Sequence, residues 1–422
     1  MSWGPKVVVV GQGYVGLPLA IRAVEAGYNV VGFETDDERA KRLAAGESDV
    51  ADVSDDTLAQ ALATGRYAAT DNPARLAGFD IAVIAVPAAL AEGLPNTRPL
   101  EDAATVLASV LTPGATVILE STTYPGTTEG LLVPLLEEGS GLVAGEQFHV
   151  GYSPERMDPG NAEWTLETTP KVVSGIDARS LDLVTQFYDR LVNQTVPVSS
   201  PREAELSKLI ETTFRHVNIA LVNELAMFAR QLGIDIGEAI DAAATKPFGF
   251  MRFTPGPGVG GHCLPIDPSH LSWRVRRSLG ESFRFVELAN DVNAHMPNQV
   301  VRRITELLND QSRAVRGSRI LLLGLAYKRN TSDTRESPAV VIANSLVRLG
   351  ADVRVADPIA DAAALGDLVL RVDPTPGELE AADVVVVVTD HEQFDYEAVG
   401  ARARSVLDCR YVVPRAANVQ YL

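Results

Sequence analysis

Short apolar runs alternate with helical patterns along the amino-terminal part of the chain. The β-branched run Lys6–Val10 leads through a glycine turn into a helical pattern from Leu17 to Ala26, and Asn29–Phe33 has the pattern of a second strand. Further apolar strands are predicted at Ile81–Val86 and Thr116–Glu120. Strands that alternate with helices are typical of an open parallel sheet that is covered by helices on both faces.

The longest helical pattern runs from Pro201 to Gly233, with apolar residues spaced three and four positions apart. At roughly 1.5 Å per residue, such a helix is about 50 Å long. Helices of this length usually bridge two domains or pair with their own copy in a dimer. A shorter helix is predicted over Ile236–Ala244.

The α/β rhythm starts again in the carboxyl-terminal part of the chain. The predicted elements are a strand at Arg319–Leu323, a helix at Ser337–Leu349, and strands at Asp352–Ala356, Asp383–Thr389 and Ser405–Asp408. We therefore predict an α/β protein with two Rossmann-like doubly wound domains joined by a long central helix. The predicted domains are residues 1–198, 199–312 and 313–422.

Composition and charge narrow the class of protein. A chain of 422 residues with 46% hydrophobic and 22% charged residues is typical of a soluble protein with several domains. Its formal charge of −18 argues against a general nucleic-acid partner, and no apolar run approaches the roughly 18 residues of a membrane helix. The two cysteines, Cys263 and Cys409, suit a reducing compartment. We expect a cytoplasmic protein without a metal site that binds neither nucleic acid nor a membrane.

The residues from Gly11 to Gly16 have the spacing Gly-x-Gly-x-x-Gly between a strand and a helix. Gly11 permits a tight turn, Gly13 lets a pyrophosphate approach the backbone, and Gly16 lets the helix pack on the strand. Glu34 ends the second strand, where a carboxylate binds both ribose hydroxyls and repels a 2′-phosphate. This favours NAD over NADP as the cofactor. The predicted cofactor contacts here are Gly11, Gly13, Tyr14, Val15, Gly16 and Glu34.

Polar residues follow the later strands, at the sheet edge where open parallel sheets bind ligands. Thr122 is placed to meet a cofactor or a substrate, with a solvated turn hydroxyl as the alternative. Glu155 has the chemistry of a base or of a group that positions water, although such a residue is often an ordinary surface carboxylate. Lys208 falls on or beside the apolar face of the long helix, where its ammonium is either partly desolvated or extended to solvent.

The stretch Gly256–Asp267 is rich in glycine and proline, so we expect no regular helix or strand through it. Its four glycines allow positive φ and the close approach of a ligand. Cys263 is either a nucleophile, because a thiolate of lowered pKa is strongly nucleophilic, or a small buried apolar residue. Asp267 follows four positions later and adds a nearby acid.

Two further groups of residues suit a phosphorylated ligand. The aromatic and basic residues between Lys246 and Arg252 fit a sugar and its phosphates, or equally a packed lid. Lys328, Arg329 and Arg335 cluster in the loop of the carboxyl-terminal domain where phosphates bind, which is informative in so acidic a chain. Two nucleotide-type domains suggest one redox cofactor and one substrate that carries a nucleotide.

Together the motifs resemble those of the nucleotide-sugar 6-dehydrogenases, the family of UDP-glucose and UDP-N-acetylhexosamine dehydrogenases. The resemblance covers nearly the whole chain, and its most specific part is the Gly-Gly-His-Cys loop. The stretches Tyr152–Arg156 and Lys246–Met251 look more like the UDP-N-acetylglucosamine branch than the UDP-glucose branch. The resemblance rests on Gly11–Gly16, Glu120–Glu129, Tyr152–Arg156, Ala204–Leu209, Gly260–Pro265 and Asp333–Pro338.

The resemblance implies a four-electron oxidation of the C6 alcohol of a UDP-sugar to a carboxylate, with NAD as the cofactor. Cys263 is then the nucleophile that forms a thiohemiacetal and a thioester, and Lys208 stabilises the oxyanion. Asp267 helps to activate water, while Thr122 and Glu155 position or deprotonate it. The long helix is implied to dimerise, and the third domain to hold the uridine diphosphate. Further implied cofactor contacts are Pro87, Thr122 and Lys328, and implied substrate contacts are Glu155, Arg156, Lys208, Phe250, Arg252, Gly260 and Arg335.

The chain departs from the family pattern at two positions. Thr212 replaces the asparagine of Lys-Leu-x-x-Asn, an amide that binds the oxyanion or the catalytic water, and the loss of one such donor costs roughly 10²–10³ in rate. Thr212 keeps one donor and stays among the predicted catalytic residues, while Ala88 removes a hydroxyl near the cofactor. The alternatives are the same chemistry on UDP-glucose, UDP-ManNAc or a TDP-sugar, and a catalytically weakened nucleotide-binding member. A two-domain 3-hydroxyacid dehydrogenase is a further alternative, but it needs neither the cysteine loop nor a third domain.

Overall fold

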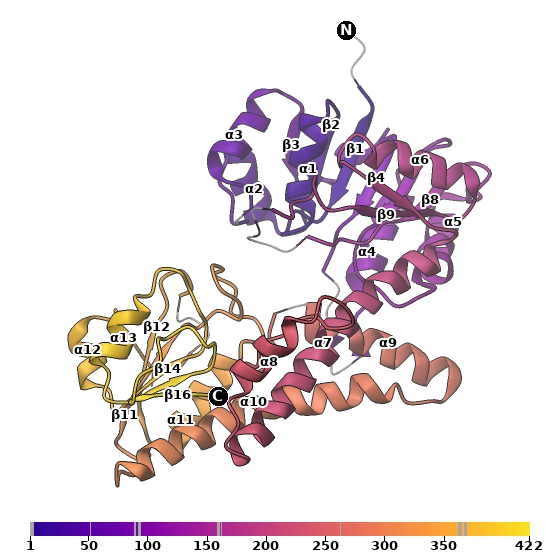
Figure 1. Cartoon of the computed structure of the whole chain (residues 1–422). Coiled ribbons are helices and arrows are strands. Elements are labelled where there is room, and N and C mark those ends of the chain that lie inside the picture. The colour runs from indigo at the N-terminus through magenta and orange to yellow at the C-terminus, as the bar shows by residue number, and fades with distance from the viewer. Residues whose placement is uncertain are drawn as a thin grey trace. The chain divides into compact units, whose positions relative to one another are not determined.

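The computed structural model describes residues 4–50, 52–87, 90–91, 94–157, 161, 163–261, 263–361, 365–366 and 369–422, without the side chains of Leu90, Ala91 and Cys263. Ala88, one of the two departures from the family pattern, lies outside the described residues. The chain divides into two compact units (Figure 1). The first unit is Met1–Glu211 with Trp273–Leu279, and the second is Thr212–Ser272 with Gly280–Leu422.

The first unit contains a doubly wound sheet with the strand order β10-β9-β8-β7-β4-β1-β2-β3. Neighbouring strands are parallel apart from the antiparallel pair β8 and β9. Val7 and Val9 of β1 pack in one core while Val8 and Val10 pack in the other, because helices cover both faces of the sheet. The strands are β1 (Lys6–Val10), β2 (Asn29–Phe33), β3 (Tyr67–Thr70), β4 (Ile81–Ile84), β7 (Thr116–Leu119), β8 (His149–Tyr152), β9 (Lys171–Gly175) and β10 (Thr195–Pro197), with β5 (Leu90–Ala91) and β6 (Leu94–Pro95) forming a separate pair.

The helices of the first unit connect these strands on both sides of the sheet (Figure 1). They are α1 (Gly16–Glu25), α2 (Asp37–Ala45), α3 (Asp55–Ala63), α4 (Arg98–Ala108), α5 (Val133–Ser140) and α6 (Ala178–Tyr188), with a short 3₁₀ helix at η1 (Pro73–Leu76) and a short π-helix at η2 (Thr128–Leu132). The predicted strands at Ile81–Val86 and Thr116–Glu120 end one or two residues earlier than expected. The remaining residues of those predicted strands start the loops at the sheet edge.

The second unit contains a parallel sheet with the strand order β13-β12-β11-β14-β15-β16. Ile320 and Leu322 of β11 face one core and Leu321 and Leu323 face the other. The prediction of two doubly wound domains is therefore confirmed. The elements are β11 (Arg319–Leu323), α11 (Pro338–Leu349), β12 (Asp352–Ala356), β13 (Leu370–Arg371), α12 (Pro376–Ala381), β14 (Val384–Val387), α13 (Tyr396–Arg402), β15 (Val406–Asp408) and β16 (Val419–Tyr421).

The described residues in the middle of the chain form four helices. Two of these helices were predicted: α7 runs over Pro201–Gln231 and α8 over Ile236–Ala244. The prediction that no helix enters the stretch Gly256–Asp267 was wrong, because α9 (Cys263–Leu279) begins at Cys263. Pro265 lies in the first turn of α9, where backbone N–H groups need no intrahelical partner, so a proline there does not prevent a helix. The pattern of α10 (Arg284–Asp310) was not recognised from the sequence.

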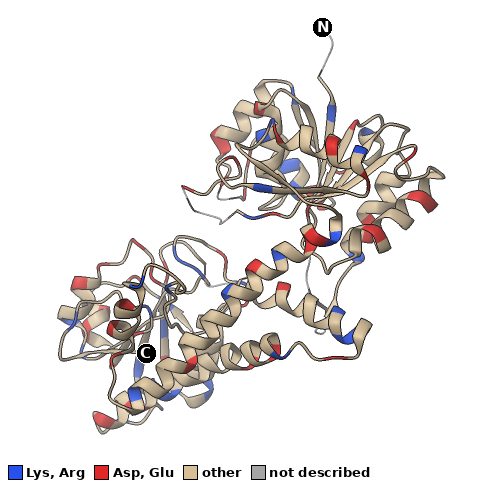
Figure 2. Ribbon diagram, turned by 45° about the vertical axis from the view of Figure 1, so that its right-hand side comes forward, with Lys and Arg blue, Asp and Glu red and all other residues tan. Residues whose placement is uncertain are grey.

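Charge and hydropathy agree with this architecture. Lys and Arg are interspersed with Asp and Glu along the ribbons of both units (Figure 2). Of the helices in the described part of the chain, none is at once long and apolar enough to span a membrane.

Candidate functional site

The glycine turn between β1 and α1 has the geometry of a dinucleotide-binding turn. Gly11 has a φ of +89°, which a side chain rarely adopts, and a Cβ on Gly16 would lie 1.8 Å from the carbonyl oxygen of Gly11. A Cβ on Gly13, in contrast, would meet no described atom within 4 Å. No described side chain caps the start of α1 at Val15. The open space at Gly13 and the uncapped helix end suit a pyrophosphate.

The carboxylate of Glu34 lies beside this turn. It accepts hydrogen bonds from the backbone N–H of Gln12 at 3.2 Å and of Thr35 at 2.8 Å. Gln12 is itself buried, and its side-chain oxygen accepts a 2.8 Å hydrogen bond from the hydroxyl of Tyr67. Glu34 is thus held at the position where the ribose of a dinucleotide binds in this fold. The residues of the turn therefore fit an NAD molecule.

The remaining predicted cofactor contacts of the first unit lie near the same sheet edge. Pro87 is exposed in the loop after β4, and Thr122 is half-buried in the loop after β7. The hydroxyl of Ser121 donates a 2.7 Å hydrogen bond to the carbonyl oxygen of Val86, which joins the two loops. Tyr14 is 36% exposed at the glycine turn.

A buried glutamate that sequence reasoning missed anchors the Thr122 loop to the long helix. Glu205 of α7 accepts hydrogen bonds from the backbone N–H of Gly126 and from both the N–H and the hydroxyl of Thr128, the last two at 2.8 Å and 2.7 Å. Tyr124 packs against Trp273 with ring centroids 5.1 Å apart. These contacts hold the loop that carries Thr122 from two sides.

Glu155 belongs to a buried cluster of charges in the first unit. The ammonium of Lys171 pairs with Glu120 and lies 3.3 Å from Glu155 Oε2. The backbone N–H groups of Arg156 and Met157 donate to Glu155 Oε1. Burial opposes the charge of Glu155, but the charges of Lys171 and Lys208 and the backbone hydrogen bonds outweigh it and lower its pKa. This buried environment is inconsistent with the alternative that Glu155 is an ordinary surface carboxylate.

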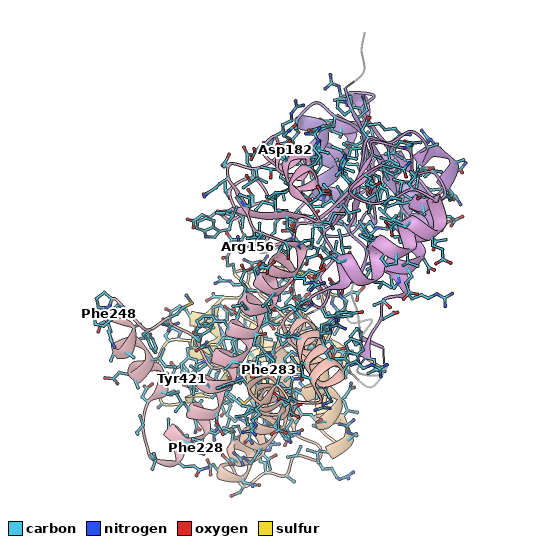
Figure 3. All side chains as sticks on the ribbon, turned by 90° about the vertical axis from the view of Figure 1, so that its right-hand side faces the viewer. Arg156, Asp182, Phe228, Phe248, Phe283 and Tyr421 are labelled. Carbon is cyan, nitrogen blue, oxygen red and sulfur yellow. The ribbon has the colours of Figure 1, made fainter. Side chains whose placement is uncertain are left out.

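Two of the predicted substrate contacts lie beside Glu155. Lys208 of α7 is half-buried, and its charge reaches the Glu155 carboxylate. Arg156, which Figure 3 labels, forms a 2.8 Å ion pair with Glu211 and donates to the carbonyl oxygen of Pro170. The first unit therefore brings together Glu155, Arg156 and Lys208.

In the second unit, the glycines before Cys263 pack against a loop of the carboxyl-terminal domain. A Cβ on Gly260 would lie 2.6 Å from the carbonyl oxygen of Glu336, and one on Gly261 would lie 2.6 Å from the ring of Tyr327. The N–H of Gly261 donates a 3.0 Å hydrogen bond to the carbonyl oxygen of Arg335. Of the four glycines, only Gly258 and Gly261 have positive φ. Gly256 and Gly260 do not use the positive φ that glycine allows, but a Cβ on either would lie within 3.0 Å of other protein atoms.

A second contact fixes the start of this loop. The side-chain oxygen of Asn223 on α7 accepts a 2.9 Å hydrogen bond from the N–H of Gly256, and its amide donates to Asn293 of α10 at 2.9 Å. Sequence reasoning did not identify Asn223 or Asn293. Their place on two helices that both pack on the loop is visible only in the fold.

The side chain of Cys263 lies outside the description, but its backbone begins α9. Asp267 follows four residues later, hence one helical turn away on the same face, and it is buried. Thr212 is buried on α7. Phe250 is 42% exposed, and Arg252 is ion-paired with Asp241 at 2.8 Å.

The predicted cationic cluster of the carboxyl-terminal domain lies in one loop, but its arginines are paired. Arg335 donates hydrogen bonds from Nε and Nη2 to the carboxylate of Asp333. Arg329 forms an ion pair with Glu392 at 3.0 Å. Lys328 is half-buried in the same loop. The guanidinium groups are thus partly neutralised by their neighbours.

The base of this loop is organised by Asp357, which sequence reasoning missed. Its carboxylate accepts hydrogen bonds from the N–H groups of Leu325 and Ala326 and lies 3.0 Å from His391 Nε2. Burial opposes the charge of Asp357, but the hydrogen bonds from His391 and from the backbone outweigh it and lower its pKa. Gly324 has a φ of +90° at this turn.

The predicted site residues thus form two sets. The first unit holds the glycine turn, Glu34, Pro87, Thr122, Glu155, Arg156 and Lys208, and the second holds Thr212, Phe250, Arg252, Gly260, Cys263, Asp267, Lys328 and Arg335.

Comparison with known proteins agrees with each part of the chain. Residues 5–192, 202–295 and 321–415 match the NAD binding, central and UDP binding domains of the UDP-glucose/GDP-mannose dehydrogenase family. UDP-N-acetyl-D-glucosamine 6-dehydrogenase of Pseudomonas aeruginosa is 36% identical over 394 residues, which cover 92% of this chain and 91% of that protein. UDP-N-acetyl-D-mannosamine dehydrogenase of Pyrococcus horikoshii is 34% identical over 414 residues, which cover 97% and 96%.

The fold comparison gives the same answer. The structure of the UDP-D-ManNAc dehydrogenase from Pyrococcus horikoshii superposes with a TM-score of 0.90 at 33% identity, covering 99% of this chain and 98% of that one. The glycine turn with Glu34 fits NAD, and the matched domains bind NAD and UDP. The chain therefore belongs to the UDP-glucose/GDP-mannose dehydrogenase family and is an NAD-dependent nucleotide-sugar dehydrogenase.

Proposed function

We propose that the chain oxidises the C6 alcohol of UDP-N-acetylglucosamine to the carboxylate through a covalent intermediate on Cys263. The observation that carries this proposal is the position of Cys263 as the first residue of α9, two residues after Gly261 in the sequence. The amino-terminal end of a helix favours a thiolate over a thiol. The relative from Pseudomonas aeruginosa, named for UDP-N-acetyl-D-glucosamine, supports this sugar.

The proposed reaction has three chemical stages. Two NAD⁺ molecules, when bound, accept the two hydrides that leave C6. Between the two oxidations, the Cys263 thiolate adds to the C6 aldehyde and forms a thiohemiacetal, which the second oxidation converts to a thioester. Water then cleaves the C–S bond, which releases the carboxylate and regenerates the thiol. The covalent bond keeps the reactive aldehyde on the protein.

We assign the other roles from the family resemblance and from the environment of each residue. Lys208 stabilises the oxyanion of the covalent intermediates. Glu155 is kept charged by its surroundings, which suits a group that accepts a proton from the alcohol or from water. Asp267, one turn after Cys263 on α9, and Thr122 help to position that water. Thr212 supplies one donor in place of the amide usual in the family.

The sugar is tested by measuring NADH with a panel of UDP-GlcNAc, UDP-ManNAc, UDP-Glc, UDP-GalNAc and TDP-Glc, with mass spectrometry of the product. We expect two NADH for each UDP-GlcNAc. The product should be heavier than the substrate by about 14 mass units, because the four-electron oxidation of a CH₂OH group to a carboxyl group removes two hydrogens and adds one oxygen. A higher kcat/KM for another sugar would reassign the substrate. Binding of NAD⁺ and UDP without turnover on any sugar would instead indicate a catalytically weakened member.

Replacement of Glu34 tests the cofactor contact. We expect Glu34→Ala to lower kcat/KM for NAD⁺ by about 10- to 100-fold, because hydrogen bonds to a charged acceptor contribute about 1.5–3 kcal/mol. Discrimination against NADP⁺ should fall as well, since no carboxylate then repels the 2′-phosphate. The matched control is Asp37→Ala, an exposed acid three residues later in α2. Equal kcat/KM values for Glu34→Ala and the wild type would contradict the assignment.

We further propose a homodimer through α7, together with the division into domains at residues 1–198, 199–312 and 313–422. Phe214, Leu221, Leu225 and Phe228 follow one another at helical spacing, and each is solvent-exposed in the single chain. Phe228 is 52% exposed, and Figure 3 shows its position in the lower part of the second unit. Contiguous exposed apolar residues of this kind mark interaction sites. Light scattering of the full chain measures its mass in solution and tests the dimer.

A further inference from the structure

Lys171 is a buried lysine that the proposed reaction does not use. It begins β9, is 2% exposed, and its ammonium lies between the carboxylates of Glu120 and Glu155. The ammonium also lies 5.1 Å from the ring centroid of Tyr188, whose hydroxyl is 3.4 Å from Glu120 Oε2. An isolated buried charge is strongly unfavourable, and each member of such a cluster depends on its partners.

The three charged groups differ in their access to solvent. The side chains of Glu120 and Lys171 are 0% and 3% exposed, while that of Glu155 is 13% exposed. Glu155 is therefore the member of the cluster that is open to a ligand. Its Oε1 is bound by two backbone N–H groups and its Oε2 by Lys171, so both oxygens are held from the protein side.

We propose that Lys171, with Glu120 as its counter-ion, is a positioning residue that holds the Glu155 carboxylate in one orientation and in its charged form. The inference rests on the proposed role of Glu155 in accepting a proton. Lys171 touches neither substrate nor cofactor and acts through Glu155. Glu120 keeps the ammonium of Lys171 in place. Without Glu120, the only ion-pair partner of the buried ammonium would be the partly exposed Glu155, which would not offset the cost of burying the charge.

Other charged groups also face Glu155, and together with Lys171 they decide how far its pKa changes when Lys171 is replaced. Lys208 from α7 stabilises its charge, while Glu120 after β7 opposes it. Arg156, the adjacent residue, is neutralised by Glu211 of α7, and the ring centroid of Tyr188 on α6 lies 5.1 Å from the Lys171 ammonium. Lys171 is in ion-pair contact with Glu155 at 3.3 Å, and an opposite charge at such a distance shifts a carboxyl pKa by roughly 1–3 units.

The test replaces the two buried residues separately. Lys171→Met should raise the pKa of Glu155 by at least about one unit, so that the acidic limb of the kcat profile moves to higher pH and activity recovers as the pH rises. Because the Glu155 pKa lies below the usual 4.5 in the wild type, a rise of roughly 1–3 units should lower kcat at pH 7 by about fivefold at most and more strongly near pH 5, while the KM for the nucleotide sugar changes little. Lys171→Arg should restore the wild-type limb. Glu120→Gln removes a negative charge and should leave the Glu155 pKa at or below its wild-type value.

A purely structural role for Lys171 would lower activity equally at every pH, and a limb that does not move in Lys171→Met would overturn the proposal. Should Lys171→Met fold poorly in thermal melts, the double variant Lys171→Met/Glu120→Gln leaves no buried charge without a partner. Its Glu155 pKa should lie above that of Glu120→Gln, because these two variants differ only in Lys171. The Glu155 pKa is also measured without turnover, by ¹³C NMR of the chain labelled at glutamate δ-carbons, with Glu155→Gln to assign the signal. This titration decides the role of Lys171 even if no sugar of the panel is oxidised.

Discussion

Replacement of Cys263 by alanine is expected to abolish NADH formation from every nucleotide sugar that the wild-type chain oxidises. The proposed thiohemiacetal and thioester both require the thiolate, so the four-electron oxidation cannot be completed without it. Loss of a covalent nucleophile lowers kcat by on the order of 10⁴–10⁶ in well-characterised enzymes. Initial rates of NADH formation at saturating NAD⁺ and sugar, with mass spectrometry of the product, measure this loss.

The chain supplies its own matched control, since it has one other cysteine. Cys409 follows β15, is fully buried in the core of the second sheet, and burial raises the pKa of its thiol. Cys409→Ala should keep kcat within about twofold of the wild type, because a buried neutral thiol is unreactive. Iodoacetamide should modify Cys263 before Cys409. A Cys263→Ala variant that retains more than about a tenth of the wild-type kcat would show that the nucleophile lies elsewhere.

Alanine at Gly16 is expected to destabilise the first unit and to remove NAD⁺ binding together. The new Cβ would lie 1.8 Å from the carbonyl oxygen of Gly11, so either α1 or the turn must move. Because the obstacle is backbone and not a flexible side chain, we expect the free energy of unfolding to fall by about 3 kcal/mol or more. The displaced turn then no longer presents its N–H groups to the pyrophosphate.

Alanine at Gly13 is the matched variant, because it separates binding from stability. A Cβ there meets no described atom within 4 Å, and Gly13 does not have a positive φ. The free energy of unfolding should change by less than about 1 kcal/mol, while the methyl group occupies the space of the pyrophosphate and raises the Kd for NAD⁺ by roughly 10- to 100-fold. Urea unfolding and calorimetric titration measure the two effects. If Gly13→Ala proved the less stable variant, the roles of the two glycines would be reversed.

The cofactor half of the site was predictable because its determinants are close together in the chain. The β-branched run from Val7 to Val10, the spacing of Gly11, Gly13 and Gly16, and the acid at Glu34 all belong to one strand–helix–strand unit. Its pairing follows from local geometry, and the structure places β1 beside β2 in the expected parallel orientation. Short-range patterns of this kind can be recognised without knowledge of the rest of the fold.

The environment of the reactive groups was not predictable in the same way. Lys171 lies 51 residues from Glu120 in the chain, and Asn223 lies 33 residues from the Gly256 that it holds. Each of these residues alone resembles many ordinary lysines and asparagines. Only the packing of β9 beside β8, and of α7 and α10 around one loop, shows that they are buried and which groups they bind.

The sequence by itself determined the fold class, the cofactor and the family, since these depend on periodicity and on motifs read over short distances. The tertiary structure alone decided that a helix begins at Cys263, that the preceding glycines make room for Tyr327 and Glu336, and that the first unit holds Glu155 in a buried ion cluster. The physical reason is that burial and charge pairing depend on residues far apart in sequence. Those distant partners decide the helix start, the glycine contacts and the charge state of the proposed base.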